Sequence, residues 1–139
     1  MFHSFHPPHF WILNFAMETV EEKSRRFAVR IVRMADYLRQ EKKEYVVSTQ
    51  VLNSGTSVGA NIAEAESTPS KRDFHATMYI AFKECNETIF WLETLHKAGK
   101  LNDKEFQSIY KDCCGIRNML AAITKTTREN IEKEKSGNK

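Results

Sequence analysis

The chain has 139 residues, a length at which one domain can bury a hydrophobic core without disulfides or a structural metal. Only five glycines and three prolines, together with 28% charged residues, favour a helical soluble domain over a turn-rich β protein or a disordered chain. The formal net charge of +3 is too small to indicate a strong nucleic-acid footprint by itself.

The N-terminal segment differs in composition from everything after it. Its first 16 residues contain no lysine, arginine, aspartate or glutamate. The apolar run at 10–16 lacks the basic region and the small-residue cleavage site of a secretory signal, and it is too short to span a membrane. Two interpretations stay open: residues 1–17 form a disordered extension, or Met17 is the true start of the protein. We therefore place the folded domain at residues 18–127 and a charged tail, which we expect to fray, at residues 128–139.

Hydrophobic residues spaced three and four positions apart predict four helices, and the first two come in the N-terminal half. No glycine or proline interrupts residues 18–43. The core stripe expected there consists of Phe27, Ile31, Met34 and Leu38. The second helix should end near Ala65, because the Ser-Thr-Pro-Ser run at 67–70 disfavours helical backbone. Its stripe consists of Val47, Val51, Ser54, Val58, Ile62 and Ala65.

The third and fourth predicted helices carry clear start and stop signals. Ser70 can cap the third helix, and Gly99 can end it in a left-handed conformation. The stripe between them consists of Phe74, Met78, Ala81, Cys85, Thr88, Leu92 and Leu95. Asn102 and Glu105 form a capping-box-like pair for the fourth helix. The stripe of that helix consists of Phe106, Ile109, Cys113, Ile116, Leu120 and Ile123.

Short connections between four amphipathic helices predict an all-α fold, an up-and-down antiparallel four-helix bundle. The apolar face of the third predicted helix is wider than its packing against the rest of the bundle requires. It also carries aromatic and aliphatic residues that a monomer would leave exposed, namely Tyr79, Phe82, Ile89, Phe90 and Trp91. An exposed apolar patch of this kind favours self-association.

The stretch SGTSVGANIAEAE, at residues 54–66, places glycines inside a predicted helix. Each glycine costs up to about 1 kcal/mol of helix propensity, which is best explained if a neighbouring backbone approaches closely. Asn61 and Glu64 lie one turn apart beside the apolar stripe, and buried polar groups there would bond across helices or subunits and set their register. A pair with the same spacing recurs in the third helix. We therefore assign structural or interface roles to Gly55, Gly59, Asn61, Glu64, Glu84, Glu87 and Trp91.

Catalytic and metal sites are not indicated. Glu93 and His96 match the Glu-x-x-His element of di-metal bundles, but no other helix supplies the second element that such a site needs. The three cysteines form neither an even disulfide set nor a CxxC motif, and we expect them to be reduced, as in the cytoplasm. Cys85 and Cys113 lie on core stripes, where thiols are inert. No nucleophile, base and acid occur at a readable spacing, so we expect no enzyme and no cofactor.

Positive charge is concentrated in the first predicted helix, which holds five of the eight arginines. Arg26, Arg30 and Arg33 lie four and three residues apart and can form a ridge that contacts successive phosphates. An ordinary solvated face with local ion pairs is the alternative. No pattern indicates base-specific recognition, so binding should be directed at the backbone. The candidate nucleic-acid-binding residues are Arg25, Arg26, Arg30, Arg33, Lys71, Arg72, Lys125 and Arg128.

The motif SGTSVGANIAEAE, followed by SKRDFHATMYIAFKECNETIFWLETL at residues 70–95, resembles a known bacterial family. Its members are four-helix-bundle proteins associated with intervening sequences in large-subunit ribosomal RNA genes, and their relatives include the accessory variability proteins of diversity-generating retroelements. The resemblance implies a bundle that assembles into a ring, typically a pentamer, without established catalysis. In the retroelement relatives it implies a basic ring that binds nucleic acid and contacts a reverse transcriptase.

Two functional hypotheses follow. The first is a ring-forming accessory protein that binds the backbone of RNA or DNA, with further copies of the chain, and a reverse transcriptase, as partners. The second is a structural or protein-interaction oligomer that binds no nucleic acid. Neither hypothesis involves a membrane.

Overall fold

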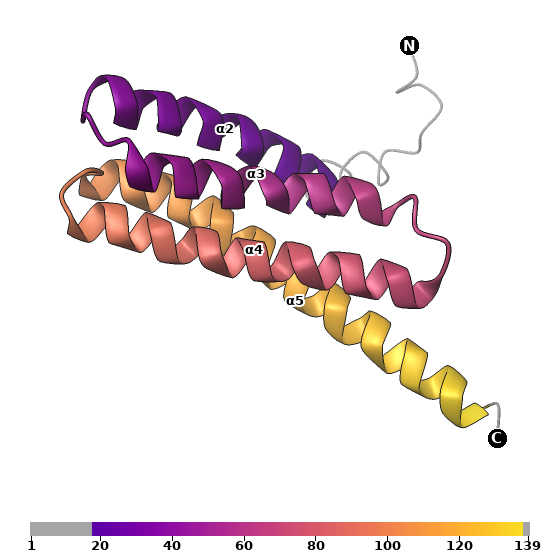
Figure 1. The fold of residues 1–139 in the computed structure, drawn as a ribbon. Helices are drawn as coiled ribbons and strands as arrows, with labels where there is room; N and C mark the ends of the chain where they lie inside the picture. The colour runs from indigo at the N-terminus through magenta and orange to yellow at the C-terminus, as the bar shows by residue number, and fades with distance from the viewer. Residues whose placement is uncertain (1–17, 138–139) are drawn as a thin grey trace, which may run out of the picture.

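The computed structural model describes residues 18–137, which form four α helices without any strand (Figure 1). The helices are α2 (Val20–Gln40), α3 (Val46–Ala65), α4 (Lys71–Lys97) and α5 (Asp103–Gly137). The predicted all-α class is therefore confirmed, whereas the predictions for residues 1–17 lie outside the described part of the chain. Each helix packs on the next one along the chain, and α5 returns to contact α2. No helix within residues 18–137 combines the length and the apolar character needed to cross a membrane.

The predicted helix boundaries between α3 and α5 agree with the capping contacts. The hydroxyl of Ser70 accepts a hydrogen bond from the backbone N–H of Asp73 at 3.1 Å and caps α4. Gly99 has a φ angle of +78°, which is the left-handed conformation expected just after the end of α4. Asn102 and Glu105 form a reciprocal capping box, because each side chain accepts a hydrogen bond of 2.8 Å from the backbone N–H of the other residue.

In α3 the buried residue is Ser48 and not the predicted Val47, and two other predicted core stripes are also shifted by one residue. In α2 the fully buried residue after Ile31 is Ala35 and not Met34, which is only half-buried and packs against the core from its edge. In α5 Thr124 is buried, while Ile123 is half-buried. Both shifts follow from the helical period, because an advance of four residues keeps a side chain on the stripe as well as an advance of three.

Small polar and sulfur groups join the helices inside the core. The hydroxyl of Thr88 on α4 donates a hydrogen bond of 2.9 Å to the hydroxyl of Ser54 on α3, and both residues are almost fully buried. The sulfur atoms of Cys85 on α4 and Cys113 on α5 lie 3.7 Å apart. A buried polar group that has a hydrogen-bond partner costs little folding free energy, so these contacts are compatible with an otherwise apolar core.

The C-terminal end of α5 differs from the prediction. Fraying was expected from Arg128 onward, but the helix continues to Gly137 and projects beyond the other helices (Figure 1). No glycine or proline occurs between Gly115 and Gly137 to interrupt it. Glu129 also precedes Lys133 by one turn, the order in which a pair of opposite charges supports a helix.

Candidate nucleic-acid interface

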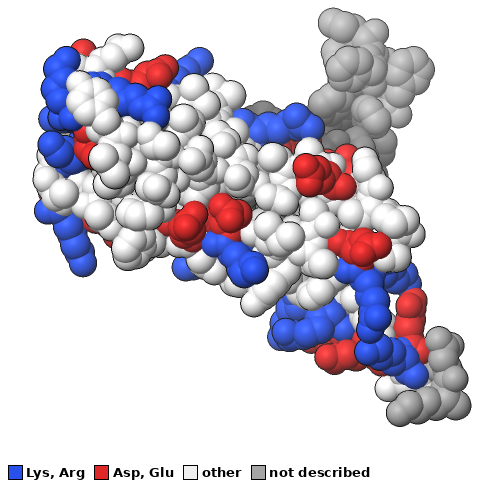
Figure 2. Space-filling model, in the orientation of Figure 1, with Lys and Arg blue, Asp and Glu red and all other residues white. Residues whose placement is uncertain are grey.

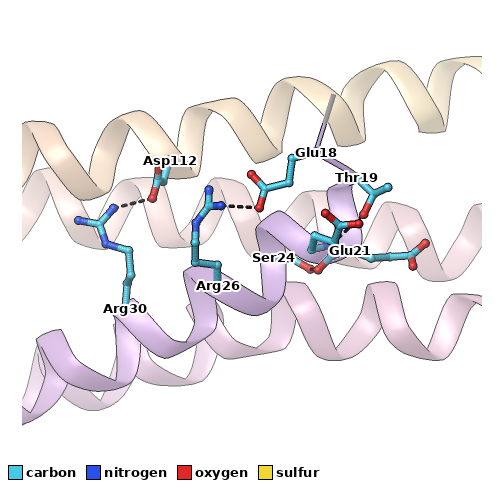
Figure 3. Close-up of polar contacts among 8 residues, drawn as sticks. Glu18, Thr19, Glu21, Ser24, Arg26, Arg30 and Asp112 are labelled. Atoms are coloured by element: carbon cyan, nitrogen blue, oxygen red, sulfur yellow. Dashed lines mark hydrogen bonds and ion pairs between the residues drawn. The ribbon is translucent and has the colours of Figure 1, made fainter. Parts of the chain in front are cut away.

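Arg30 connects α2 to α5. Its guanidinium group donates a hydrogen bond of 2.5 Å to a carboxylate oxygen of Asp112 (Figure 3). It also donates one of 2.7 Å to the hydroxyl of Ser108. A third contact, of 3.3 Å, reaches the backbone carbonyl of Ser108. Arg30 therefore acts first as a link between two helices, and its charge is largely balanced by Asp112.

The predicted ridge on α2 is only partly available to phosphates. Arg26 pairs with Glu18, and this hydrogen bond raises the pKa of the Arg26 guanidinium (Figure 3). Arg25 and Arg33 are exposed. Within residues 18–137, the structure contains no hydrogen bond or ion pair from the Arg33 side chain. Of the three arginines that define the predicted ridge, Arg33 is thus the one whose charge has no partner in the described chain.

Arg33 lies at the rim of a groove between α2 and α5. The groove has a volume of about 480 Å³. Its apolar lining comes from Met34 and Tyr37 of α2 and from Leu101 and Ile109, while Arg33 and Lys104 contribute positive charge. Leu101 and Ile109 are almost fully buried and form part of the core, so the groove has a rigid apolar floor.

The phenol of Tyr37 lies near a carboxylate at this groove. Its pKa is raised, mainly by the polar interaction with the carboxylate of Glu105 on α5, while the nearby Lys42 acts in the opposite direction. Lys42 thus adds a further positive charge close to the groove. The sequence analysis missed Tyr37 and Lys104, because nothing in the linear pattern indicates that α2 and α5 leave an open seam at this point.

The remaining basic candidates lie at the other end of the helices. Lys71 at the start of α4 forms an ion pair with Glu134 near the end of α5. Arg72 and Lys135 line a second hollow, of about 400 Å³, between the same two segments. Lys125 and Arg128 are exposed on the C-terminal half of α5. The structure therefore divides the predicted basic set between two separate regions.

The glycines of the 54–66 motif face α2. A Cβ atom at Gly59 would lie 3.2 Å from the backbone carbonyl oxygen of Ser24, and one at Gly55 would lie 2.9 Å from two side-chain carbons of Ile31. The small residues thus allow α2 and α3 to approach closely. Within residues 18–137, the side chain of Asn61 bonds to its own helix, where its amide donates to the carbonyl of Ser57 one turn earlier at 2.8 Å.

The other residues assigned an interface role lie on the exposed sides of α3 and α4. Glu64 and Glu87 are exposed, whereas Glu84 is half-buried. Burial raises the pKa of the Glu84 carboxyl group, and repulsion from Glu87 adds to this effect. The indole N–H of Trp91 is buried and has no hydrogen-bond partner in the described chain. The ring of Phe90, which is 57% exposed, packs edge-on against Trp91.

The surface over α3 and α4 has a simple charge distribution. Figure 2 shows that uncharged atoms cover most of the middle of this side, while lysine and arginine side chains gather toward its two ends. Acidic side chains interrupt this face, and those that α4 carries are Asp73, Glu84, Glu87 and Glu93. A largely uncharged middle with basic ends separates the surface suited to packing from the surface suited to anions.

The residues considered for metal binding or catalysis have other contacts. His96 hydrogen-bonds to Asp103 at 2.7 Å and stacks on Phe106, with 4.2 Å between ring centroids. No group of three or more potential metal ligands occurs within residues 18–137. The pKa of the Cys113 thiol is raised by its hydrogen bond to Cys85 and by burial, which lowers its reactivity.

Comparisons with known proteins agree with the fold. The chain is similar to a protein of unknown function from the S23 ribosomal protein family of Bacteroides thetaiotaomicron, known from a crystal structure. The two sequences are 46% identical, the match covers 77% of this chain and 99% of the other, and the TM-score is 0.76. No curated protein matches the chain. The profile of the 23S rRNA-intervening sequence protein family matches residues 18–122, and the chain therefore belongs to that family.

Proposed function

We propose that this protein is a non-enzymatic accessory protein that assembles into a ring and binds the backbone of nucleic acid. The unit is an up-and-down antiparallel four-helix bundle, and the ring is a pentamer, as the family resemblance implies. The observation that carries the proposal is the separation of a largely uncharged α3–α4 face from basic regions on the same subunit (Figure 2). One surface can then assemble the subunits while the other binds an anionic partner.

Assembly is supported by apolar groups on α3 and α4. Val46 is 72% exposed, Ile80 43% and Phe90 57%. Removing such side chains from water contributes about 25 cal/mol per Å² of apolar area. The buried indole N–H of Trp91 lacks an acceptor in the described chain, and a neighbouring subunit can supply one. The half-buried Glu84 also gains if a neighbour provides a hydrogen-bond donor.

Backbone binding is supported by the exposed cations near the α2–α5 groove. Arg33 lies at its rim together with Lys104, and Lys42 is close to Tyr37. Each subunit offers only a few phosphate contacts, but a ring repeats them, and linked weak contacts add through effective concentration. By resemblance to the retroelement accessory proteins, a reverse transcriptase is a further proposed partner.

Action without catalysis is supported by the chemistry of the cysteine pair. Both Cys85 and Cys113 are fully buried, and the raised pKa of Cys113 opposes formation of the nucleophilic thiolate. His96 is engaged by Asp103 and Phe106 rather than placed beside a nucleophile.

The test is light scattering of the full chain, alone and with mixed-sequence RNA, at low and moderate salt. We expect a ring-sized particle that gains mass with RNA at low salt and loses it at moderate salt, because phosphate contacts release counterions. Arg33→Glu should weaken RNA retention without changing the particle mass. Lys133→Glu, the same charge reversal on the projecting end of α5, is the matched control. A monomeric particle contradicts the ring, and a ring that ignores RNA at low salt contradicts nucleic-acid binding.

The second candidate is a structural or protein-interaction oligomer without nucleic acid. It is favoured by one observation, namely that Arg26, Arg30 and Lys71 already form ion pairs within the chain. A ring that ignores RNA is the result expected for this candidate.

A further inference from the structure

We propose that the groove between α2 and α5 holds an unpaired base of single-stranded RNA, with the flanking phosphates on Arg33 and Lys104. This inference rests on the proposed function, and it assigns that function to one site and one form of nucleic acid. In this groove apolar surface, an aromatic ring and the positive charges of Arg33 and Lys104 meet.

The shape and lining of the groove suit a base. Its volume of about 480 Å³ is within the range of small-molecule sites, which is roughly 300–1,000 Å³. The floor is built from Leu101 and Ile109, whose burial fixes their positions. Met34 and Tyr37 form the wall, and the carboxylate of Glu105 lies near the phenol of Tyr37. A flat aromatic ring beside an apolar floor is a stacking platform for a base.

An apolar floor favours a single strand over a duplex. In a duplex the bases are stacked on one another, so a protein meets mainly phosphates and groove edges, and the apolar surface would gain nothing. A single strand can turn one base outward and bury it. The stacking of one base on an aromatic side chain contributes more binding free energy than one or two phosphate contacts that are screened by salt.

The charges around the groove match a strand that passes over it. Arg33 approaches from α2 and Lys104 from α5, so a base between them has a cation for the phosphate on either side. Arg30 also lines the groove, but its charge is balanced by Asp112, so it shapes the wall rather than attracting phosphate. The net attraction therefore lies at the two rims and not along the floor.

Glu105 favours RNA over DNA. Its carboxylate lines the groove, where it would repel a phosphate but can accept a hydrogen bond. A carboxylate has about four acceptor sites, and the hydrogen bond from the backbone N–H of Asn102 leaves capacity for another donor. The ribose 2′-hydroxyl is such a donor, and deoxyribose lacks it.

The experiment compares fluorescence anisotropy of labelled single-stranded RNA, single-stranded DNA and duplex RNA of equal length with the full chain. Single-stranded RNA should bind most tightly. Tyr37→Ala should weaken its binding roughly 5- to 150-fold, the range that corresponds to loss of one stacked base. Tyr37→Phe keeps the ring and should bind nearly as well as the original protein. Duplex binding should be the same for all three proteins.

A second measurement does not depend on how well the variant folds. Single-stranded RNA that carries 4-thiouridine should cross-link, on irradiation of the unmodified protein, to the peptide that contains Met34 and Tyr37. Cross-links confined to other helices, with equal binding of single strands and duplex, would overturn the groove assignment while leaving nucleic-acid binding intact. Absence of binding to every nucleic acid at low salt would overturn the proposed function itself.

Two further outcomes concern the occupant. Equal affinity for single-stranded RNA and DNA would overturn the role given to Glu105. If Tyr37→Ala changes the particle mass in the absence of RNA, the groove belongs to a contact between subunits, and the RNA site is wrong.

Discussion

The atoms beside two helical glycines lead to the prediction that replacement by alanine has opposite effects on stability at the two positions. Gly55 and Gly115 both lie inside helices, so replacing either with alanine gains about 1 kcal/mol of helix propensity. A Cβ at Gly55 would lie 2.9 Å from Cγ1 and Cγ2 of Ile31, which is fully buried and branched at Cβ. A Cβ at Gly115 would meet only the Nζ of Lys23, at the same distance.

The change in unfolding free energy at each glycine depends on whether its neighbour, Lys23 or Ile31, can move away. The ammonium group of Lys23 ends a flexible side chain and can move at little cost, so Gly115→Ala should stabilise the domain by up to about 1 kcal/mol. The branched carbons of Ile31 cannot turn away inside a packed core, and overpacking of this kind costs about 1–3 kcal/mol. After the propensity gain of about 1 kcal/mol, Gly55→Ala should destabilise by about 0–2 kcal/mol.

The assay is urea unfolding followed by far-ultraviolet circular dichroism at one fixed protein concentration, because assembly makes stability depend on concentration. The free energies of the two variants should differ by about 1–3 kcal/mol. Ile31→Ala removes the obstructing carbons at a cost of about 2–5 kcal/mol, and in that background Gly55→Ala should stabilise by up to about 1 kcal/mol. A Gly55→Ala variant that is as stable as Gly115→Ala, or an equal effect of Gly55→Ala in both backgrounds, would contradict the clash with Ile31.

Three other predictions concern polar groups. Asp112→Asn removes the charge that faces Arg30 and should lower the unfolding free energy by about 0.5–1 kcal/mol, an effect that should shrink at high salt in the same urea assay. Ser70→Ala removes the cap of α4 and should cost about 1 kcal/mol at any salt concentration, so a salt-dependent loss would contradict the capping role. The raised pKa of Glu84 means that the folded state holds this proton more tightly than the unfolded chain, so stability falls as pH rises through that range. Glu84→Gln, which also removes the repulsion from Glu87, should therefore raise the urea midpoint near pH ~7 but not near pH ~4, and an equal shift at both would refute the burial effect.

The sequence alone determined the helices and most of their limits. The capping box of Asn102 and Glu105, the cap at Ser70 and the left-handed Gly99 were all readable, because each depends on residues within about one turn of the chain. Periodicity also identified most of the core, but it could not choose between Met34 and Ala35. Neighbouring positions on one stripe differ only in how closely another helix approaches, and that distance is a tertiary property.

The candidate site was decided by the tertiary structure. The arginine ridge was visible as a spacing, yet the pairing of Arg30 with Asp112 depends on which face of α5 lies opposite α2. The groove likewise joins Tyr37 and Arg33 to Lys104, which is far away in the sequence. Helical periodicity reports which side of one helix is apolar, but ion pairs and grooves arise between helices. The partner of each charge, and therefore the set of cations left without a partner at the surface of the described chain, was settled only when the helices packed.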